Sequence, residues 1–237
     1  MQQGILYGIG VGSGDKELIT IKAVNTIKEC DYLIIPKSGK ENESVAGLII
    51  DEHIKPETEK EFIVFPMKKD NQVAEVYRTV ADEICRRLAK GKSVGFVTIG
   101  DPMFFSTFCY LKYIVEAAGF TTKSVAGVFS FAAIASDLGI PLGLQNDKLC
   151  VVTEYVKQET EKIIVMFETV VFLKIARYYN SVKPVLTEKS ILDKCFLVSN
   201  CGLENEKIIN DLTDMEENNI PYLSTMILRK GNTNGKR

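Results

Sequence analysis

Apolar positions in the first half of the chain follow two alternating patterns. Short runs rich in Ile, Leu and Val predict buried strands, and apolar residues spaced three or four apart predict amphipathic helices. The expected strands are residues 4–10, 31–36 and 93–99, and the expected helices are residues 17–30, 73–90 and about 106–118. Strands that alternate with helices over short connections indicate a parallel α/β sheet.

The second half of the chain has a different pattern, in which one helix precedes several segments rich in strand-forming residues. The helix is expected at 129–138, and the strands at 149–153, 170–173, 195–199 and 222–228. The change of pattern places a boundary near residues 113–122, which gives two α/β domains, 1–117 and 118–237. A cleft between two such lobes is a common place for a ligand. The tail from 231 to 237 has no apolar residue and is expected to fray.

Composition and charge exclude several classes of protein. Hydrophobic residues are 46% and charged residues 25% of the chain, which excludes wholesale disorder. The 29 Lys and Arg against 31 Asp and Glu give a formal charge of −2, so we expect no nucleic-acid partner. No apolar run approaches the ~20 residues of a membrane helix, and the start of the chain lacks the basic and apolar regions of a signal peptide. We therefore expect a soluble cytoplasmic protein without a membrane partner.

Cysteine and histidine usage limits the chemistry further. The six cysteines form no C-x-x-C pair, and the chain has one histidine, so the usual Cys/His zinc sets cannot be built and no metal site is expected. The cysteines are expected to be reduced, buried thiols. His53 lies in a polar stretch and is expected at the surface, which leaves mechanisms that need a histidine base without a well-placed candidate.

A glycine-rich loop follows the first expected strand and is the first segment with candidate chemistry. Four glycines stand at every second position over residues 8–14, which lets a ligand approach the backbone closely. The dinucleotide pattern G-x-G-x-x-G fails in both registers, because Ser13 stands where a start at Gly8 needs glycine, and Asp15 where a start at Gly10 needs it. A carboxylate at the start of the next helix also repels a phosphate. The loop therefore suits a ligand without phosphates, or it serves only as a tight turn.

A second loop, Gly100-Asp101-Pro102, ends the strand at 93–99. The carboxyl edge of a parallel sheet is where α/β proteins bind ligands, although Asp101-Pro102 is also typical of a simple strand-ending turn. Ser106 or Thr107 is expected to cap the helix that follows. Residue pattern and spacing thus predict a two-lobed α/β protein with a phosphate-free ligand site.

Three segments together resemble the signature motifs of the tetrapyrrole methylases, which transfer methyl groups from S-adenosylmethionine (SAM) to uroporphyrinogen-derived rings. They are GIGVGSGDKELIT at 8–20, GDPMFFST at 100–107 and AGVFSFAAIASDLGIPL at 126–142. The resemblance extends from residue 4 to about 229. The variant GDP-x-x-[YF]-S-T and the chain length are similar to the branch that methylates carbon 20 of precorrin-2 or cobalt-factor II.

The resemblance implies two α/β domains of the tetrapyrrole methylase type, with SAM bound in the cleft between them, a tetrapyrrole as substrate, and a homodimer. By matched position, the residues expected to bind SAM are Ile99, Gly100, Asp101, Phe104, Ser106, Thr107, Phe129, Ser130, Leu173, Lys174, Asn200, Leu203 and Thr225. The residues expected at the tetrapyrrole are Gly10, Gly12, Ser13 and Lys37. The sequence departs from the family pattern where Ser13 replaces a proline, Phe105 a tyrosine, and Phe129 a small hydroxyl residue.

The implied reaction needs alignment and a dry cavity more than a base, because the ring carbon is itself the nucleophile. Asp101 is the candidate catalytic residue, either orienting SAM or taking part in proton removal. The ring's carboxylates require local cations, for which Lys37 is preferred. The other candidates are Lys68, Lys69, Lys174 and Arg177.

Three alternatives remain open at this stage. The chain could methylate another ring carbon, or act on a macromolecule as a diphthine-synthase-like or ribosomal-RNA methylating relative. It could also be a binding module that keeps the SAM pocket without turnover.

Overall fold

The computed structural model describes residues 3–37, 43–65, 71–213, 215 and 220–231. Contacts divide the chain into two compact units, Met1–Phe129 and Ser130–Arg237, which are described separately below. The sequence placed the boundary between residues 117 and 118. The next strand, Thr121–Val125, pairs with the first strand of the chain and so belongs to the first unit.

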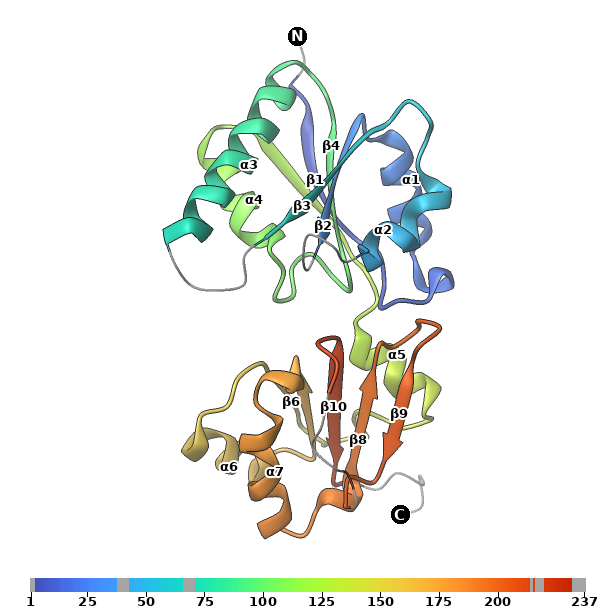
Figure 1. Ribbon diagram of the computed structural model, residues 1–237, viewed down its shortest axis with the longest axis vertical. Coiled ribbons are helices and arrows are strands. Elements are labelled where there is room, and N and C mark those ends of the chain that lie inside the picture. The colour runs from blue at the N-terminus through green and yellow to red at the C-terminus, as the bar shows by residue number, and fades with distance from the viewer. Residues whose placement is uncertain (1–2, 38–42, 66–70, 214, 216–219, 232–237) are drawn as a thin grey trace. The chain divides into compact units, whose positions relative to one another are not determined.

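The first unit contains a five-stranded sheet in which every neighbouring pair of strands is parallel (Figure 1). Its strands are β1 (Ile5–Gly10), β2 (Tyr32–Lys37), β3 (Glu59–Val64), β4 (Val94–Thr98) and β5 (Thr121–Val125). Their order across the sheet is β3-β2-β4-β1-β5, so β2, β4 and β1 lie in the interior. The carboxyl ends of all five strands therefore meet at one edge.

Helices cover both faces of this sheet. They are α1 (Ile21–Glu29), α2 (Val45–Ile50), α3 (Asn71–Ala89) and α4 (Phe108–Ala117), with short 3-10 helices η1 (Lys16–Leu18) and η2 (Asp51–His53). The helices α3 and α4 lie on one face, and α1 and α2 on the other (Figure 1). Alternate strand residues point to opposite faces, so Phe96 packs in one core and Val97 in the other.

The second unit contains a five-stranded sheet of mixed direction. Its strands are β6 (Leu149–Val152), β7 (Thr169–Leu173), β8 (Cys195–Ser199), β9 (Lys207–Asn210) and β10 (Ser224–Arg229). The order is β6-β7-β10-β8-β9, with β6 and β7 parallel and the other neighbours antiparallel. The helices are α5 (Ser130–Asp137), α6 (Lys157–Met166) and α7 (Tyr179–Glu188), with η3 (Ile175–Arg177) and η4 (Leu192–Lys194).

The core of the second unit lies between its sheet and α7, where Phe172, Val182 and Met226 are fully buried. An ion pair between buried Arg229 and half-buried Asp147 fixes the C-terminal end of β10. The Arg229 guanidinium, whose side chain is fully buried, contacts the Asp147 carboxylate at 2.6 Å and donates to the Thr169 hydroxyl at 3.0 Å.

Several expectations from the pattern can be compared directly with these elements. The helix expected at 17–30 begins at Ile21, because the Thr20 hydroxyl accepts a hydrogen bond from the Ala23 N–H and caps it there.

None of the six cysteines forms a disulfide, and three of them are buried. Burial, helped by nearby carboxylates, raises the pKa of the Cys30 thiol to about 12, so this sulfur is protonated at neutral pH. Among the described helices, none is long and apolar enough to span a membrane.

Candidate active site

Three loops of the first unit meet at the carboxyl edge of its sheet, and glycine allows them to touch. The Gly100 N–H donates to the Gly12 carbonyl oxygen at 2.7 Å. A Cβ added to Gly10 would lie 2.5 Å from the Gly100 oxygen, and one added to Gly127 would lie 2.0 Å from the same atom. Backbone packing therefore explains the glycines at 10 and 127, before any ligand is considered.

Asp101 joins the second and third of these loops. One carboxylate oxygen accepts a hydrogen bond from the Met103 N–H at 2.8 Å, and the other accepts one from the Gly127 N–H at 3.1 Å. The side chain is half-buried. Both oxygens thus accept hydrogen bonds from backbone N–H groups, so the Asp101 side chain links the two loops.

Gly100 differs from its neighbours because its open side faces free space. It has a φ of 72°, a left-handed conformation that glycine adopts without strain. Nothing lies within 4 Å of the position that a Cβ would take. A ligand can therefore approach this backbone directly, and the SAM contact expected of Gly100 stays a prediction.

Two hydroxyl residues close the second loop. The buried Ser106 hydroxyl accepts a hydrogen bond from the Phe108 N–H at 3.2 Å, at the start of α4, and donates to the Thr98 hydroxyl at 3.3 Å. Thr107 makes no capping hydrogen bond. The helix-start role expected of Ser106 or Thr107 is therefore confirmed for Ser106. Ile99, beside this loop, packs partly against a core cluster of the first unit.

Three phenylalanines form an aromatic cluster at the same loops. The Phe104 ring centroid lies 4.8 Å from those of Phe105 and of Phe129, in edge-to-face contacts. Phe104 and Phe129 are half-buried, whereas Phe105 is 56% exposed and has a φ of 50°. The structure thus brings together two predicted SAM residues, Phe104 and Phe129, and adds Phe105.

The remaining predictions for the first unit concern its loop residues and lysines. Ser13 is buried, and Gly12 is tied to Gly100. Asp15 accepts a hydrogen bond from the Glu17 N–H at 2.8 Å at the start of η1, so the carboxylate expected at this helix start is confirmed. Lys37 ends β2, half-buried, with its ammonium 5.8 Å from the centroid of the Phe62 ring. Lys68 and Lys69 lie outside the described residues.

Residues predicted from the late segments gather at one sheet edge of the second unit. Thr225 pairs with Leu173 across β10 and β7, and the Thr225 and Ser130 hydroxyl oxygens are 3.4 Å apart. Leu173 is half-buried at the end of its strand. Ser130, Leu173 and Thr225 are therefore brought together, although 95 residues separate the first from the last in sequence.

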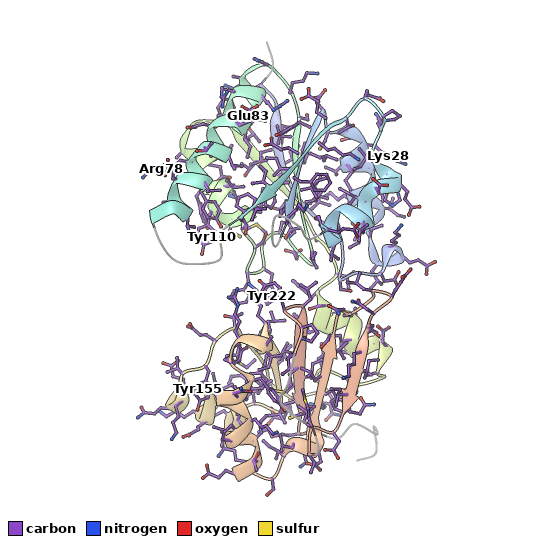
Figure 2. All side chains as sticks on the ribbon, viewed as in Figure 1. Lys28, Arg78, Glu83, Tyr110, Tyr155 and Tyr222 are labelled. Atoms are coloured by element: carbon purple, nitrogen blue, oxygen red, sulfur yellow. The ribbon has the colours of Figure 1, made fainter. Side chains whose placement is uncertain are left out.

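Two cations adjoin this edge. Lys174, directly after β7, is half-buried with a φ of 56°. Burial and the nearby Arg177 charge lower the pKa of the Lys174 ammonium. Within the described part of the chain, no carboxylate forms an ion pair with Lys174. The Arg177 guanidinium lies over the Tyr222 ring, 5.4 Å from its centroid. Tyr222, labelled in Figure 2, lies just before β10. The arrangement favours an anionic group beside Lys174.

Asn200 and Leu203 lie in the turn between β8 and β9. Asn200 has a φ of 54°, and its N–H donates to the Leu223 carbonyl oxygen at 2.7 Å, which joins the turn to the start of β10. The Leu203 N–H donates to the Asn200 carbonyl oxygen at 3.0 Å, and the Leu203 side chain is half-buried. Asn200 is thus adjacent to the edge formed by Ser130, Leu173 and Thr225, and Leu203 is joined to Asn200.

Sequence reasoning missed two residues that organise these edges. Gly127 is the third partner in the glycine contact, and its presence in the motif at 126–142 was the available signal. The Tyr178 hydroxyl lies 2.8 Å from the Leu173 carbonyl oxygen and 3.1 Å from that of Val152, so it joins the ends of β7 and β6. Nothing in the sequence around Tyr178 distinguishes it from an ordinary core tyrosine.

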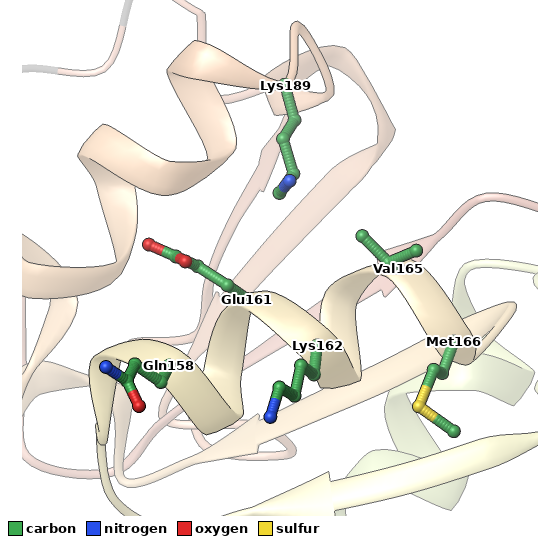
Figure 3. A pocket seen from close by; sticks show the side chains of 6 residues that line it. All are labelled: Gln158, Glu161, Lys162, Val165, Met166 and Lys189. Carbon is green, nitrogen blue, oxygen red and sulfur yellow. The ribbon is translucent and has the colours of Figure 1, made fainter.

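Two further features of the second unit lie away from these residues. A surface pocket of about 390 Å³ beside α6 is lined by six residues, Gln158, Glu161, Lys162, Val165, Met166 and Lys189 (Figure 3). None of them is a predicted site residue. Asp137, Cys201 and Glu206 place one potential metal-ligand atom each within 4.8 Å of the others, but Glu206 accepts a hydrogen bond from the Gly202 N–H at 2.6 Å. Asp137, Cys201 and Glu206 are not predicted site residues either.

Comparison with known proteins gives full-length relatives. A probable cobalt-precorrin-2 C(20)-methyltransferase of Methanocaldococcus jannaschii is 32% identical over 228 residues, covering 95% of this chain and 96% of the relative. The cobalt-precorrin-2 C(20)-methyltransferase of Salmonella typhimurium is 29% identical over 230 residues, covering 96% and 97%.

Solved structures show the same fold. A cobalt precorrin-4 methyltransferase of cobalamin biosynthesis superposes with a TM-score of 0.76 at 19% identity, covering 95% of this chain and 94% of the other. A uroporphyrin-III C-methyltransferase of Thermus thermophilus, complexed with S-adenosylhomocysteine (SAH), has a TM-score of 0.71 at 18% identity, covering 96% and 98%. The sequence profile of the Tetrapyrrole (Corrin/Porphyrin) Methylases matches residues 5–216. The chain belongs to this family of tetrapyrrole methylases.

Proposed function

We propose that the protein is a SAM-dependent C-methyltransferase of cobalamin biosynthesis, which methylates carbon 20 of precorrin-2 or of its cobalt complex. The observation that carries this proposal is the 32% identity with the M. jannaschii relative over nearly the whole of both chains. The S. typhimurium relative, named for the same reaction, supports it independently. The motif GDPMFFST at 100–107 agrees with that branch of the family.

The polar groups at the sheet edge of the second unit fit SAM as the methyl donor. The Ser130 and Thr225 hydroxyls can hydrogen-bond to a nucleoside, and the half-buried Leu173 offers an apolar contact beside them. Lys174 can pair with a carboxylate. In the first unit, Asp15 occupies the helix start where a phosphate would bind. This donor set suits a ligand with a base, hydroxyls and a carboxylate but no phosphates, and the SAH complex of the T. thermophilus structure agrees with it.

Bound SAM supplies an electrophilic methyl group on a sulfonium cation, and the contribution of the protein is to position the reactants. Holding the nucleophilic ring carbon in line with the methyl group lowers the barrier by converting a bimolecular step into an intramolecular one. The three loops of the first unit, joined by the glycine contacts and by Asp101, provide a fixed surface for this purpose. The open side of Gly100 lets a reactant approach the backbone without displacing a side chain.

Asp101 acts in this scheme as a positioning residue. Its two carboxylate oxygens accept the Met103 and Gly127 N–H groups, which fixes the loop that presents Gly100. A role in removing the proton from the methylated carbon remains a prediction. Ser106 supports the same loop through α4.

Recognition of the substrate's carboxylates requires local cations, because the chain as a whole carries a formal charge of −2. Lys37 at the end of β2 and the pair Lys174 and Arg177 at the end of β7 are the proposed cations. Lys37 is the last residue of β2, at the edge of a parallel sheet where α/β folds place their ligands, and Lys174 and Arg177 follow the end of β7. Gly10, Gly12 and Ser13 remain predicted contacts of the tetrapyrrole.

We also propose that the protein works as a homodimer in the cytoplasm. The family resemblance supports the dimer. Six cysteines without a disulfide support a reducing compartment.

The test is anaerobic turnover with SAM and either precorrin-2 or cobalt-precorrin-2, followed by absorbance and by release of SAH. The proposal predicts transfer of one methyl group to one of the two substrates, and the faster substrate identifies the branch. SAH release from neither substrate, by a protein that binds SAH in calorimetry, would show a binding module without this activity.

A further inference from the structure

Phe105 combines two unfavourable features that a loop residue normally avoids. Its φ of 50° lies in the left-handed region, which a bulky side chain adopts only where the surroundings impose it. Its ring is 56% exposed. Glycine or asparagine would remove both features. Among the six non-glycine residues with positive φ in the described chain, Phe105 is the only apolar one. Strain of this kind is concentrated at ligand sites.

The Phe105 ring is also held in place from behind. It contacts Phe104 edge to face with a 4.8 Å centroid distance and a 77° angle between planes, and Phe104 contacts Phe129 in the same manner. The loop that carries Phe104 and Phe105 begins at Asp101, whose carboxylate is tied to two backbone N–H groups. The exposed ring is therefore presented by a braced loop rather than by a free one.

The position of Phe105 connects it to the proposed reaction. It follows Gly100 by five residues in the same loop, and Gly100 has free space on its open side. Met103, 48% exposed, adds a further apolar surface to this loop. An exposed, rigid aromatic face is complementary to a flat, apolar π-system whose charged groups lie at its periphery.

We propose that Phe105, braced by Phe104 and Phe129, is an aromatic platform that contacts the face of the tetrapyrrole macrocycle. This inference rests on the proposed function and names the surface that receives its ring substrate. The carboxylates of the macrocycle remain free to meet cations at its edge. The strained conformation is retained because it aims the ring outward, where the macrocycle covers it on binding.

The experiment compares Phe105→Gly, Phe105→Tyr and wild type in binding uroporphyrin III, an oxidised octacarboxylate ring that is stable in air. Glycine suits a φ of 50°, so Phe105→Gly removes the ring without adding backbone strain. We expect uroporphyrin to bind roughly tenfold more weakly to this variant, from lost stacking, with its melting temperature retained. Phe105→Tyr keeps the aromatic face and should bind like wild type. Tyr113→Ala removes a similarly exposed aromatic ring from α4 and should leave binding unchanged.

Calorimetry with SAH distinguishes the macrocycle from the adenine of the donor. Unchanged SAH affinity in Phe105→Gly supports the platform, and a loss confined to SAH overturns it by assigning the ring to adenine. Equal uroporphyrin affinity of Phe105→Gly and wild type, in a protein that methylates its substrate, overturns the platform alone. A wild type that neither binds uroporphyrin nor methylates a tetrapyrrole overturns the proposed function together with the platform.

Discussion

The two units collect their candidate site residues at sheet edges of different construction. In the first unit, backbone dominates: Gly10, Gly100 and Gly127 are in contact, and Asp101 binds two N–H groups. In the second unit, side chains dominate, with the Ser130 and Thr225 hydroxyls and the Lys174 ammonium at the ends of separate elements. The first edge is thus held by backbone contacts and carries the phenylalanine cluster, and the second is a set of polar side chains suited to hydrogen bonding.

The difference follows from how the strands are connected. All strands of the first sheet are parallel, so every strand-to-helix loop reaches the same edge and the loops must pack against one another. The second sheet is mixed, and its edge combines the end of β7 with the start of β10. Short glycine motifs therefore mark the first edge in the sequence, while the second edge is made of single residues far apart in the chain.

The substitution expected to disturb the first edge most is Gly127→Ala. The new Cβ would lie 2.0 Å from the Gly100 oxygen and 2.8 Å from the Gly10 carbonyl carbon, and backbone cannot yield as a flexible side chain can. We expect a loss of about 3 kcal/mol or more in the free energy of unfolding, measured by denaturant titration. Gly143→Ala is the matched control, because its Cβ would meet nothing closer than 3.8 Å and should change stability little. Equal stability of the two variants would contradict the close contact.

Asp101→Asn should have the next largest effect. An amide offers one acceptor oxygen where the carboxylate offers two, so one of the Met103 and Gly127 N–H groups would face an NH₂ donor. We expect a loss of about 2 kcal/mol in the free energy of unfolding. The exposed Asp82 on α3 provides the control, since Asp82→Asn removes a charge without a backbone partner. If Asp101→Asn were as stable as the control but inactive, a direct role in proton transfer would replace the positioning role.

Those two predictions also show which part of the site was accessible from sequence. Glycine spacing and the Gly100-Asp101-Pro102 loop predicted the first edge, because steric exclusion of a Cβ leaves a signature in residue type. The same reasoning could not predict the left-handed Phe105, since nothing about phenylalanine favours that conformation. Nor could it find Tyr178, whose partners are backbone carbonyls of two strands.

The elements of the fold likewise include some that the sequence predicted and some that it missed. The interior strands β1 and β4 were predicted because both of their faces are buried, which gives continuous apolar runs. The edge strands β3 and β5 were missed, because exposed polar residues such as Glu59 and Lys123 occupy much of each strand and leave only a short apolar run or none. The helix α7 was also missed, and Pro184 within it is a residue that normally argues against a helix.

In the second unit, Asp147→Asn tests whether the ion pair of Asp147 with buried Arg229 is maintained by charge. The Arg229 hydrogen bond, with the Leu144 N–H, holds the pKa of the Asp147 carboxyl below its ordinary value of 3.8. A lowered folded-state pKa stabilises the protein above the unfolded pKa, and that stability is lost as pH falls through the folded one. The stability difference between wild type and variant should therefore be constant above about pH 5 and shrink below pH 4. A difference that grows on acidification would contradict the pairing.

The smallest expected effect concerns the hydroxyl pair of the second edge. Ser130→Ala and Thr225→Val each remove one hydroxyl, and the loss of a single hydrogen bond to a bound nucleoside weakens affinity roughly fivefold. Calorimetry with SAH measures this effect. Thr187→Ala is a control, because the exposed Thr187 hydroxyl bonds only within its own helix. An SAH affinity unchanged in both edge variants would remove the pair from the donor site.

The central claim is that a chain with these two edges transfers the methyl group of SAM to one carbon of a tetrapyrrole. Incubation of cobalt-precorrin-2 or precorrin-2 with SAM carrying a ¹³C methyl group, followed by mass spectrometry and carbon NMR of the product, tests it directly. The account predicts one labelled methyl group, attached at carbon 20. A label at another ring carbon would contradict the proposed position, and an unlabelled tetrapyrrole would contradict the activity itself.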